Sequence, residues 1–212
     1  TGSELLSVLI PRATGKSIES FLQERIFGPL GMKDTSFVVP ANKLDRLSSA
    51  YWTNAADGSL IFADGPAGSE WSQPPAFEDG SAGLVSTIDD FLAFSRMLLN
   101  HGKHGNERIL SRPSVDVMTS DQLTDAQKCA SIANGLAEGH GWGFGMSIVT
   151  RRDQVAHSVG TYGWDGGLGT SWYADPREEM TTMLLTNASW TSPSPPRLFL
   201  DFWTSAYQAL DD

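Results

Sequence analysis

The residues best suited to chemistry lie in a glycine-rich segment, 160–176, which also carries several aromatic side chains. Glycine allows a sharp backbone turn and lets another group approach the backbone closely. The segment runs into two predicted strands, 170–174 and 180–186, joined by a turn over 175–178. A strand edge beside such a turn can present backbone N–H groups to a reacting oxygen. The alternative is a hairpin whose glycines serve only close packing, and the rest of the chain must decide between the two.

Histidine is the other residue type that could do chemistry. His101 and His104 have a spacing found in metal sites, but no cysteine or carboxylate closes the set, which favours a solvated loop. His157 has no Gly-x-Ser-x-Gly context nearby, and this favours a strand-end histidine over a catalytic base. The glycine spacing is not a dinucleotide fingerprint, because a strand rather than a helix follows it. We therefore predict neither a metal nor a cofactor.

Helical patterns dominate the first half of the chain. Apolar residues at helical spacing, with capping residues before them, predict helices over 5–10 (ended by Pro11 and Gly15), from the cap Ser17 to 27, from the cap Thr87 to about 100, from the cap Ser111 to 118 and, more weakly, over 123–134. Asp90 is expected to complete a capping pair with Thr87. A short strand is expected at 37–39. Residues 50–80 read as an irregular surface excursion that either serves a cleft or is a decorative insertion.

The second half changes to a strand pattern. Apolar and small residues alternate over 141–148, and 155–159 is a second candidate strand before the two that follow the glycine-rich segment. A closing helix over 198–210 has a broad apolar face that is expected to pack on the sheet. Helices first, an antiparallel meander next and a helix last predict an α+β fold.

Composition limits the partners. A formal net charge of -10 over 212 residues argues against nucleic acid or an anionic membrane as partner, and no apolar run is long enough to cross a bilayer. Cys129 is the only cysteine, so no internal disulfide is expected. The chain begins in mid-pattern without Met, and we expect the true N-terminus to lie upstream. The compartment, cytoplasmic or exported, stays open.

The order of these pieces resembles the serine β-lactamase-like family, which includes class C β-lactamases, family VIII carboxylesterases and D,D-peptidase relatives. Residues 14–35 are similar to the helix that follows the family's second motif, and 83–99 to its next helix entry. Residues 163–176 resemble its third motif in the esterase-type variant. The resemblance implies a β-lactamase/transpeptidase-like antiparallel sheet flanked by helices, incomplete at the N-terminus, with 1–212 as the C-terminal portion of a single domain.

Members of that family use a Ser-x-x-Lys nucleophile and a Tyr-x-Asn or Tyr-x-Ser base, and neither pattern occurs in this sequence. The resemblance implies that the strand facing the nucleophile carries Trp164, Asp165 and Gly166 in a substrate site with Tyr162, and that the backbone N–H of Gly167 donates to the oxyanion. Trp164 stands where a cation or imidazole is usual, which favours esters over β-lactams. Asp165 departs from a small residue, and we expect it to point away or to bond backbone N–H groups.

Three hypotheses follow. The first is a serine hydrolase that forms an acyl-enzyme with a small acyl substrate, with its nucleophile and base in a missing N-terminal portion, so that residues 1–212 alone are inactive. The second is a non-catalytic homologue that uses the same fold for binding or assembly. The third is an intact, unrelated α+β binding protein, which would require Thr1 to be a true N-terminus.

Overall fold

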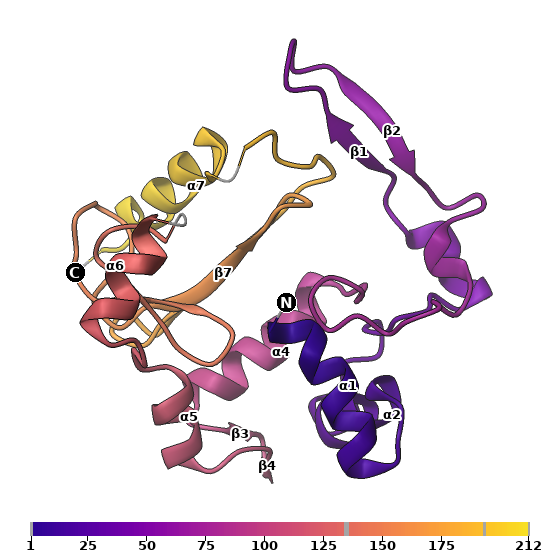
Figure 1. Cartoon of the computed structure of the whole chain (residues 1–212), viewed down its shortest axis with the longest axis horizontal. Helices are drawn as coiled ribbons and strands as arrows, with labels where there is room; N and C mark the ends of the chain where they lie inside the picture. Colours follow the sequence, from indigo (N-terminus) through magenta and orange to yellow (C-terminus); the bar gives the residue numbers. More distant parts are fainter. Residues whose placement is uncertain (1, 134–135, 193, 212) are drawn as a thin grey trace. The chain divides into compact units, whose positions relative to one another are not determined.

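A computed structural model describes residues 2–133, 136–192 and 194–211, and these divide into two compact units. Unit 1 comprises residues 1–50 and 62–109, and unit 2 comprises 51–61 and 110–212. The division falls within a two-stranded sheet formed by β1 (Ala50–Thr53) and β2 (Leu60–Asp64), which Figure 1 shows in purple. The predicted mixture of helices and antiparallel strands is confirmed.

Unit 1 is mainly helical. Its remaining elements, in chain order, are α1 (Gly2–Thr14), α2 (Ile18–Leu22), a π-helical turn (Gln23–Phe27), α3 (Gly28–Leu30), two 3₁₀ turns (Ala41–Arg46 and Glu70–Ser72), α4 (Ile88–Leu99) and the short strands β3 (Lys103–His104) and β4 (Glu107–Arg108). The capping predictions at Ser17 and Thr87 are confirmed, because each side chain accepts a hydrogen bond from a first-turn N–H. Pro11 does not end its helix as expected. The helix passes through it and closes where the N–H of Gly15 donates to the Pro11 carbonyl.

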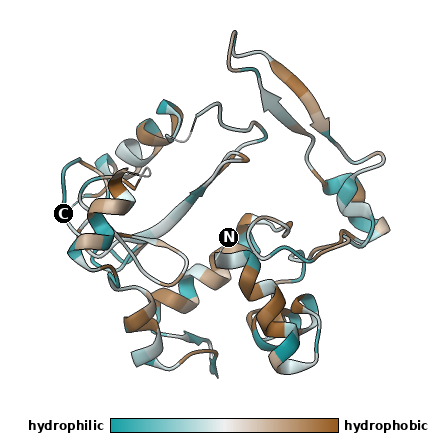
Figure 2. Cartoon of the chain, viewed as in Figure 1, coloured by the Kyte–Doolittle hydropathy of each residue, from teal (hydrophilic) through white to brown (hydrophobic). Residues whose placement is uncertain are grey.

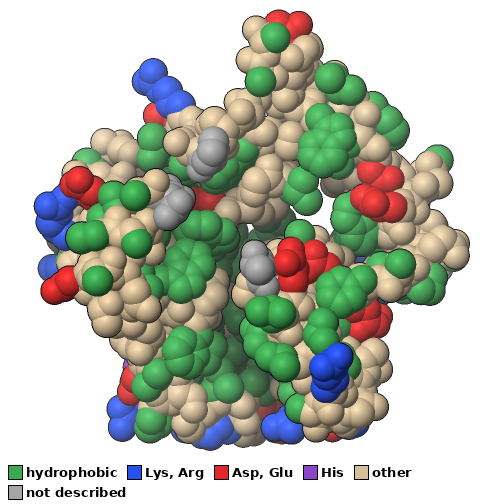
Figure 3. Space-filling view, viewed as in Figure 1, with side chains coloured by type: hydrophobic (Ala, Val, Ile, Leu, Met, Phe, Trp, Pro, Cys, Tyr) green, Lys and Arg blue, Asp and Glu red, His purple; other side chains and the backbone are tan. Residues whose placement is uncertain are grey.

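The apolar stripe of α1 faces outward in the described chain. Leu5, Leu6 and Leu9 are each more than half exposed, whereas Ser7 is buried and accepts a hydrogen bond from the N–H of Gly80. Figure 2 shows apolar residues of α1 in brown, and Figure 3 shows hydrophobic side chains at the surface of the same view. Their exposure leaves a helix face without a packing partner among the described residues.

Asp90 does more than cap a helix. Its N–H donates to the Thr87 hydroxyl, but its carboxylate accepts from the N–H of Asp34 and from the hydroxyl of Thr35. The expected reciprocal capping pair is therefore only half formed, because the Asp90 side chain ties α4 to the segment before the first 3₁₀ turn. No strand forms at 37–39; Ser36 makes a single antiparallel bridge to Val85 instead.

Unit 2 is built on a five-stranded antiparallel sheet in the order β5-β6-β7-β8-β9. Its elements are α5 (Arg112–Met118), α6 (Asp125–Ala133), β5 (His140–Trp142), β6 (Ser147–Val149), β7 (Tyr162–Gly166), β8 (Thr170–Asp175), β9 (Met180–Leu185) and α7 (Arg197–Gln208). The Ser111 cap of α5 is confirmed. Position 134, where the weaker helix was expected to end, lies outside the described residues.

Two strand predictions in this unit were wrong. The alternating stretch 141–148 is a hairpin rather than one strand, because Gly145 turns the chain with a φ of 85° and the N–H of Gly143 donates to the Met146 carbonyl. Residues 155–159 form no strand. His157 has a φ of 60°, a left-handed conformation that an extended strand cannot contain.

Helix α7 closes one face of the sheet, as expected, and Figure 1 shows it alongside the strands. Phe199, Trp203 and Tyr207 are buried against Tyr173 and Ala156. The Trp203 indole N–H donates to the Ser171 hydroxyl at 3.0 Å, and the Tyr207 hydroxyl donates to Asp175 at 2.6 Å. None of the helices in the described ranges has the length and apolar character needed to cross a membrane.

Asp175 is the polar anchor of this packing, and its removal should be costly. It is 1% exposed and accepts hydrogen bonds from the Tyr207 hydroxyl and from the N–H groups of Ser158 and Arg177. Asp175→Ala should lower the free energy of unfolding by about 3 kcal/mol, since several buried donors lose their acceptor. Urea denaturation would measure this. The exposed Asp201→Ala is the matched control, and equal effects of the two changes would contradict the prediction.

Candidate functional site

The candidate site begins with β7, which holds four of the five predicted site residues in an alternating arrangement. Tyr162, Trp164 and Gly166 share one face of the strand, and Asp165 lies on the other, because side chains alternate along a strand. The Tyr162 ring is in the core, only 2% exposed, so its contribution to a site would come through the strand that it anchors. Trp164 is 49% exposed, and its indole is therefore available for contact.

The backbone edge of β7 is only partly covered. On one side β8 pairs with the whole strand, from Tyr162 to Gly166. On the other side the register with β6 includes only Tyr162 and Gly163. Within the described chain, the β7 edge from Trp164 onward therefore has no strand beside it. An open strand edge of this kind can present main-chain groups to another molecule.

Gly167 is the first residue of the turn after β7, not a strand residue. The turn closes where the N–H of Gly169, at a φ of 98°, donates to the Gly166 carbonyl at 2.9 Å. Two hydrogen bonds of 2.8 Å from residues outside the turn hold it in place. The N–H of Thr186 donates to the Gly169 carbonyl, and the N–H of Trp190 donates to the Gly167 carbonyl. Across the described residues no group accepts from the Gly167 N–H. The turn thus fixes a backbone donor that is left free.

Trp164 has an aromatic neighbour that the sequence interpretation did not include. The Trp142 and Trp164 rings meet edge to face, with their centroids 4.6 Å apart. This geometry is favourable for aromatic pairs and limits the rotation of the exposed indole. Trp142 was predicted only as a strand residue, and nothing in its spacing indicated that the β5–β6 hairpin would bring it to Trp164.

Asp165 bonds a side chain rather than the backbone N–H groups that were one expectation for it. Its Oδ2 accepts from the Tyr173 hydroxyl at 2.8 Å, and the Ser171 hydroxyl, directly opposite in the β7–β8 register, lies beside the same carboxylate. Burial raises the pKa of Asp165 above its usual value, against the hydrogen bonds from Ser171 and Tyr173 that lower it. Burial and the neighbouring Asp165 charge also raise the pKa of Tyr173.

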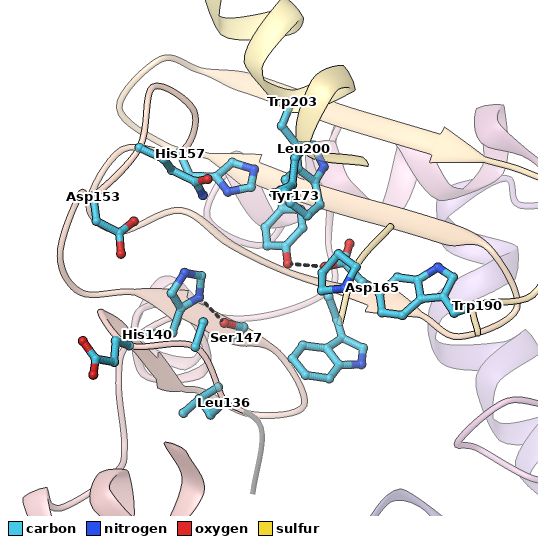
Figure 4. Close-up of a pocket in the computed structure, with 15 residues that line it drawn as sticks. Leu136, His140, Ser147, Asp153, His157, Asp165, Tyr173, Trp190, Leu200 and Trp203 are labelled. Atoms are coloured by element: carbon cyan, nitrogen blue, oxygen red, sulfur yellow. Dashed lines mark hydrogen bonds between the residues drawn. The ribbon is translucent and has the colours of Figure 1, made fainter. Parts of the chain in front are cut away.

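A pocket of about 300 Å³ lies beside this strand, and Figure 4 shows it. Its apolar walls come from the sheet, α7 and the neighbouring segments, and they are Leu136, Ala137, Trp164, Tyr173, Trp190, Pro195, Leu200 and Trp203. Its polar walls are Glu138, His140, Ser147, Asp153, Gln154, His157 and Asp165. The pocket thus includes two predicted site residues, Trp164 and Asp165, and several that the sequence interpretation missed.

His157 is the least expected member of the pocket. It is 2% exposed and stacks on Tyr173 with ring centroids 4.3 Å apart, and Trp203 lies 4.9 Å away. Neither ring nitrogen has a hydrogen-bond partner among the described residues. Burial, with His140 nearby, lowers the pKa of His157 to about 4, so its ring is neutral at pH 7. It is neither the strand residue predicted nor a base hydrogen-bonded to a nucleophile in the described chain.

The remaining candidate groups are His140, the pair His101 and His104, and Cys129, and they form no second site among the described residues. The His140 Nδ1 lies 2.8 Å from the Ser147 hydroxyl, and burial lowers the pKa of His140. No group of three or more His, Cys, Asp or Glu side chains that could hold a metal ion occurs in 2–133, 136–192 or 194–211. Cys129 is exposed and unbonded to sulfur.

The buried His157 should make stability depend on pH. Between its ordinary pKa of 6.5 and its folded value of about 4, the unfolded chain binds a proton that the folded chain does not. The free energy of unfolding should therefore fall by about 3 kcal/mol as the pH falls through this window, and it should be fully recovered above pH 6.5. His157→Phe keeps the ring and removes the titration. Thermal melts of both proteins from pH 4 to 7 test this, and equal pH slopes would contradict it.

The sequence of this chain is similar to those of known proteins. A family model described as Beta-lactamase matches residues 1–199. Protein Rv1367c of Mycobacterium tuberculosis is 35% identical over 188 residues, which cover 86% of this chain and 46% of that protein. Esterase EstB of Burkholderia gladioli is 27% identical over 212 residues, which cover 91% of this chain and 50% of that protein. The chain thus spans about half the length of these relatives.

A solved structure confirms the fold. A mutant of the simvastatin synthase LovD from Aspergillus terreus superimposes with a TM-score of 0.79 at 22% identity. The match covers 97% of this chain and 53% of that one. At this identity the likeness concerns the fold alone, and it agrees with the sheet and helix arrangement expected from the sequence.

Proposed function

Because the chain belongs to the beta-lactamase family, we propose that it is the C-terminal portion of a serine hydrolase that cleaves esters or related acyl compounds through an acyl-enzyme. The nucleophile and its base would come from residues of the full-length protein that precede this chain. Three observations support the proposal: similarity to an esterase, a match to only about half of each relative, and the free N–H of Gly167 at the open edge of β7.

The free N–H of Gly167 is the observation that carries the proposal. In acyl transfer, a serine hydroxyl attacks the acyl carbon while its proton passes to a base, and the carbonyl oxygen becomes an oxyanion. A fixed backbone donor lowers the energy of that oxyanion without having to reorganise. The alcohol then leaves with the proton, and water attacks the acyl-enzyme in the same way to release the acid and restore the serine.

Trp164 is proposed to select the substrate. Its half-exposed indole is apolar and carries no charge, so it can pack on an acyl or alcohol group but cannot pair with a carboxylate as a lysine does. A Cβ at Gly166 would lie 2.4 Å from the Thr170 hydroxyl oxygen, so the glycine serves close packing with Thr170. The uncharged indole of Trp164 therefore favours neutral esters over β-lactams.

Asp165 is proposed to support the strand rather than to react. A full negative charge near the oxyanion would oppose catalysis. Asp165 lies on the face of β7 opposite to Trp164 and accepts a hydrogen bond from Tyr173, and its pKa is raised by burial. Its position on the opposite face and its hydrogen bond from Tyr173 reduce its electrostatic cost at the site.

The full-length protein tests the proposal. Incubation with a fluorophosphonate probe should label one serine that has a lysine three residues after it, and p-nitrophenyl butyrate should be hydrolysed. Residues 1–212 alone should show neither reaction. A full-length protein without label or turnover would overturn the proposal and would favour the non-catalytic homologue, since residues 1–212 contain no Ser-x-x-Lys.

A further inference from the structure

The turn that carries the free Gly167 N–H depends on bonds from outside it. Residues 166–169, which we call the oxyanion turn, include three glycines. Glycine has no side chain to limit its dihedral angles, so a turn of this composition does not hold one orientation alone. A reacting group misplaced by about 1 Å can cost about 10²-fold in rate. The contacts that fix the oxyanion turn therefore bear on catalysis.

Two successive peptide groups set the direction of the free donor. The first joins Gly166 to Gly167, and its carbonyl accepts from the Gly169 N–H within the turn. A trans peptide is planar, so the N–H of the same group points the opposite way, out of the turn. The carbonyl of the next group, that of Gly167, accepts from the Trp190 N–H at 2.8 Å. The direction of the Gly167 N–H therefore depends on where Trp190 is held.

The segment 186–190 lies against the oxyanion turn at two further points. The N–H and the hydroxyl of Thr186 both donate to the Gly169 carbonyl, each at 2.8 Å. A Cβ built on Gly169 would lie 2.3 Å from the Ala188 carbonyl oxygen, so the two backbones are in direct contact. Movement of 186–190 would therefore move the turn with it.

The other side of this segment is tied to β1. Tyr51 forms a parallel bridge with Ala188. Its N–H donates to the Asn187 carbonyl at 2.8 Å, and its carbonyl accepts from the Ser189 N–H at 2.9 Å. Thr53 adds two bonds to Ser189, from its N–H to the hydroxyl at 3.1 Å and from its hydroxyl to the carbonyl at 2.7 Å. All of these residues belong to unit 2, as does the oxyanion turn.

We propose that Thr53 and Ser189 are positioning residues for the Gly167 N–H. Neither needs to touch the substrate. Their two hydrogen bonds hold the segment 186–190 between β1 and the oxyanion turn, and that segment fixes the direction of the donor. The inference rests on the proposed function, and it gives the first strand of the 50–80 excursion a role at the site.

Removal of the Thr53 hydroxyl in the full-length protein tests this role. Thr53→Val keeps the branched shape and should lower kcat for p-nitrophenyl butyrate by about tenfold with KM unchanged, because the oxyanion forms only after the substrate has bound. Thr53→Ser keeps the hydroxyl and should stay within about twofold of the wild type. Thr150→Val is the matched control, since it removes a hydroxyl bond of 2.8 Å to the Gly139 carbonyl and should leave kcat unchanged. Equal effects of Thr53→Val and Thr150→Val would overturn the proposal, as would a loss confined to KM.

A double-mutant cycle shows whether Thr53 acts through the donor. Gly167→Pro has no N–H at that position, so adding Thr53→Val to it should lower kcat no further. Two residues that acted independently would instead give the same fold loss in either background. That result would overturn the proposal, because a merely structural role of Thr53 predicts it.

Hydrogen exchange of the full-length protein adds a measurement that needs no turnover. Thr53→Val should speed deuterium uptake by the amides of 166–169 and 186–190, whereas α7 in the same variant and the whole Thr150→Val protein should show no change. Unaltered uptake in 166–169 and 186–190 would overturn the proposal. If the wild type is active and Gly167→Pro lowers its kcat, an inert Thr53→Val change overturns the positioning role alone. A wild type without turnover overturns the proposed function, and the positioning role with it.

Discussion

Replacing Gly167 with proline in the full-length protein is expected to lower kcat by about 10²–10³-fold, because proline has no N–H to donate to the oxyanion. The turn itself should survive, since its closing bonds are made by the carbonyls of Gly166, Gly167 and Gly169. KM should change little, because the oxyanion forms only after the substrate has bound. Steady-state hydrolysis of p-nitrophenyl butyrate measures both constants.

Alanine at the same position separates the missing donor from the added bulk. A Cβ at Gly167 would meet no atom within 4 Å, and the residue has no left-handed φ, so Gly167→Ala keeps the N–H without strain. Its kcat should stay within about threefold of the wild type, which is under 1 kcal/mol in barrier height. If alanine and proline reduce kcat equally, the N–H is not the donor. A loss confined to KM would contradict the role as well.

Gly163→Ala is expected to have the largest effect on stability. Gly163 faces Tyr173 in the β7–β8 register, and a Cβ there would lie 2.0 Å from the Trp172 carbonyl oxygen and 2.7 Å from the Tyr173 Cα. Both contacts are with backbone in the middle of the sheet, so neither can be relieved by turning a side chain. We expect the free energy of unfolding to fall by about 3 kcal/mol or more, a large part of the stability of an ordinary domain.

Gly167→Ala serves as the control for this substitution too, since it adds the same methyl group four residues away in open space. Urea denaturation of both variants gives the comparison, and the soluble yield gives an early indication. A Gly163→Ala protein as stable as Gly167→Ala would mean that β7 and β8 lie further apart than the structure has them.

The helices could be predicted because their signals are local. Ser17, Thr87 and Ser111 each stand directly before the helix that they cap, and the apolar spacing behind them needs only the sequence itself. The two strands after the glycine-rich segment were also found, since a turn separates two apolar runs there. These signals lie within a few residues of the element that they define.

The predictions were wrong where the structure depends on the backbone conformation of one residue or on contacts between residues far apart in the chain. The alternation of apolar and small residues over 141–148 would be the same in one strand and in a hairpin. Only the left-handed backbone conformation of Gly145 distinguishes the two. Likewise, nothing in the apolar run 155–159 shows that His157 adopts a left-handed conformation. Its ring contact with Trp203 joins residues 46 positions apart in the chain, and a sequence pattern does not contain such a pairing.

Part of the candidate site could also be predicted, because some of its signals are local in the sequence. The glycines of the turn stand out in the sequence, and so does the unusual Asp165. Its partner Tyr173 depends on the β7–β8 register, in which Asp165 faces Ser171 and the tyrosine lies diagonally next to it. The pocket could not be predicted from local patterns, because its walls come from four strands, α7 and the segments between them.

The position of α7 in the chain sets the order in which unit 2 can mature during translation. Ser171 and Asp175 leave the ribosome 32 residues before Trp203 and Tyr207, which satisfy and cover them. Until the helix emerges, the nascent sheet has an uncovered apolar face and an aspartate without its tyrosine donor. At about 5–20 residues per second this interval lasts a few seconds, which is long enough for a chaperone to bind. Slow codons between β9 and α7 would lengthen this interval, whereas slow codons after α7 would not.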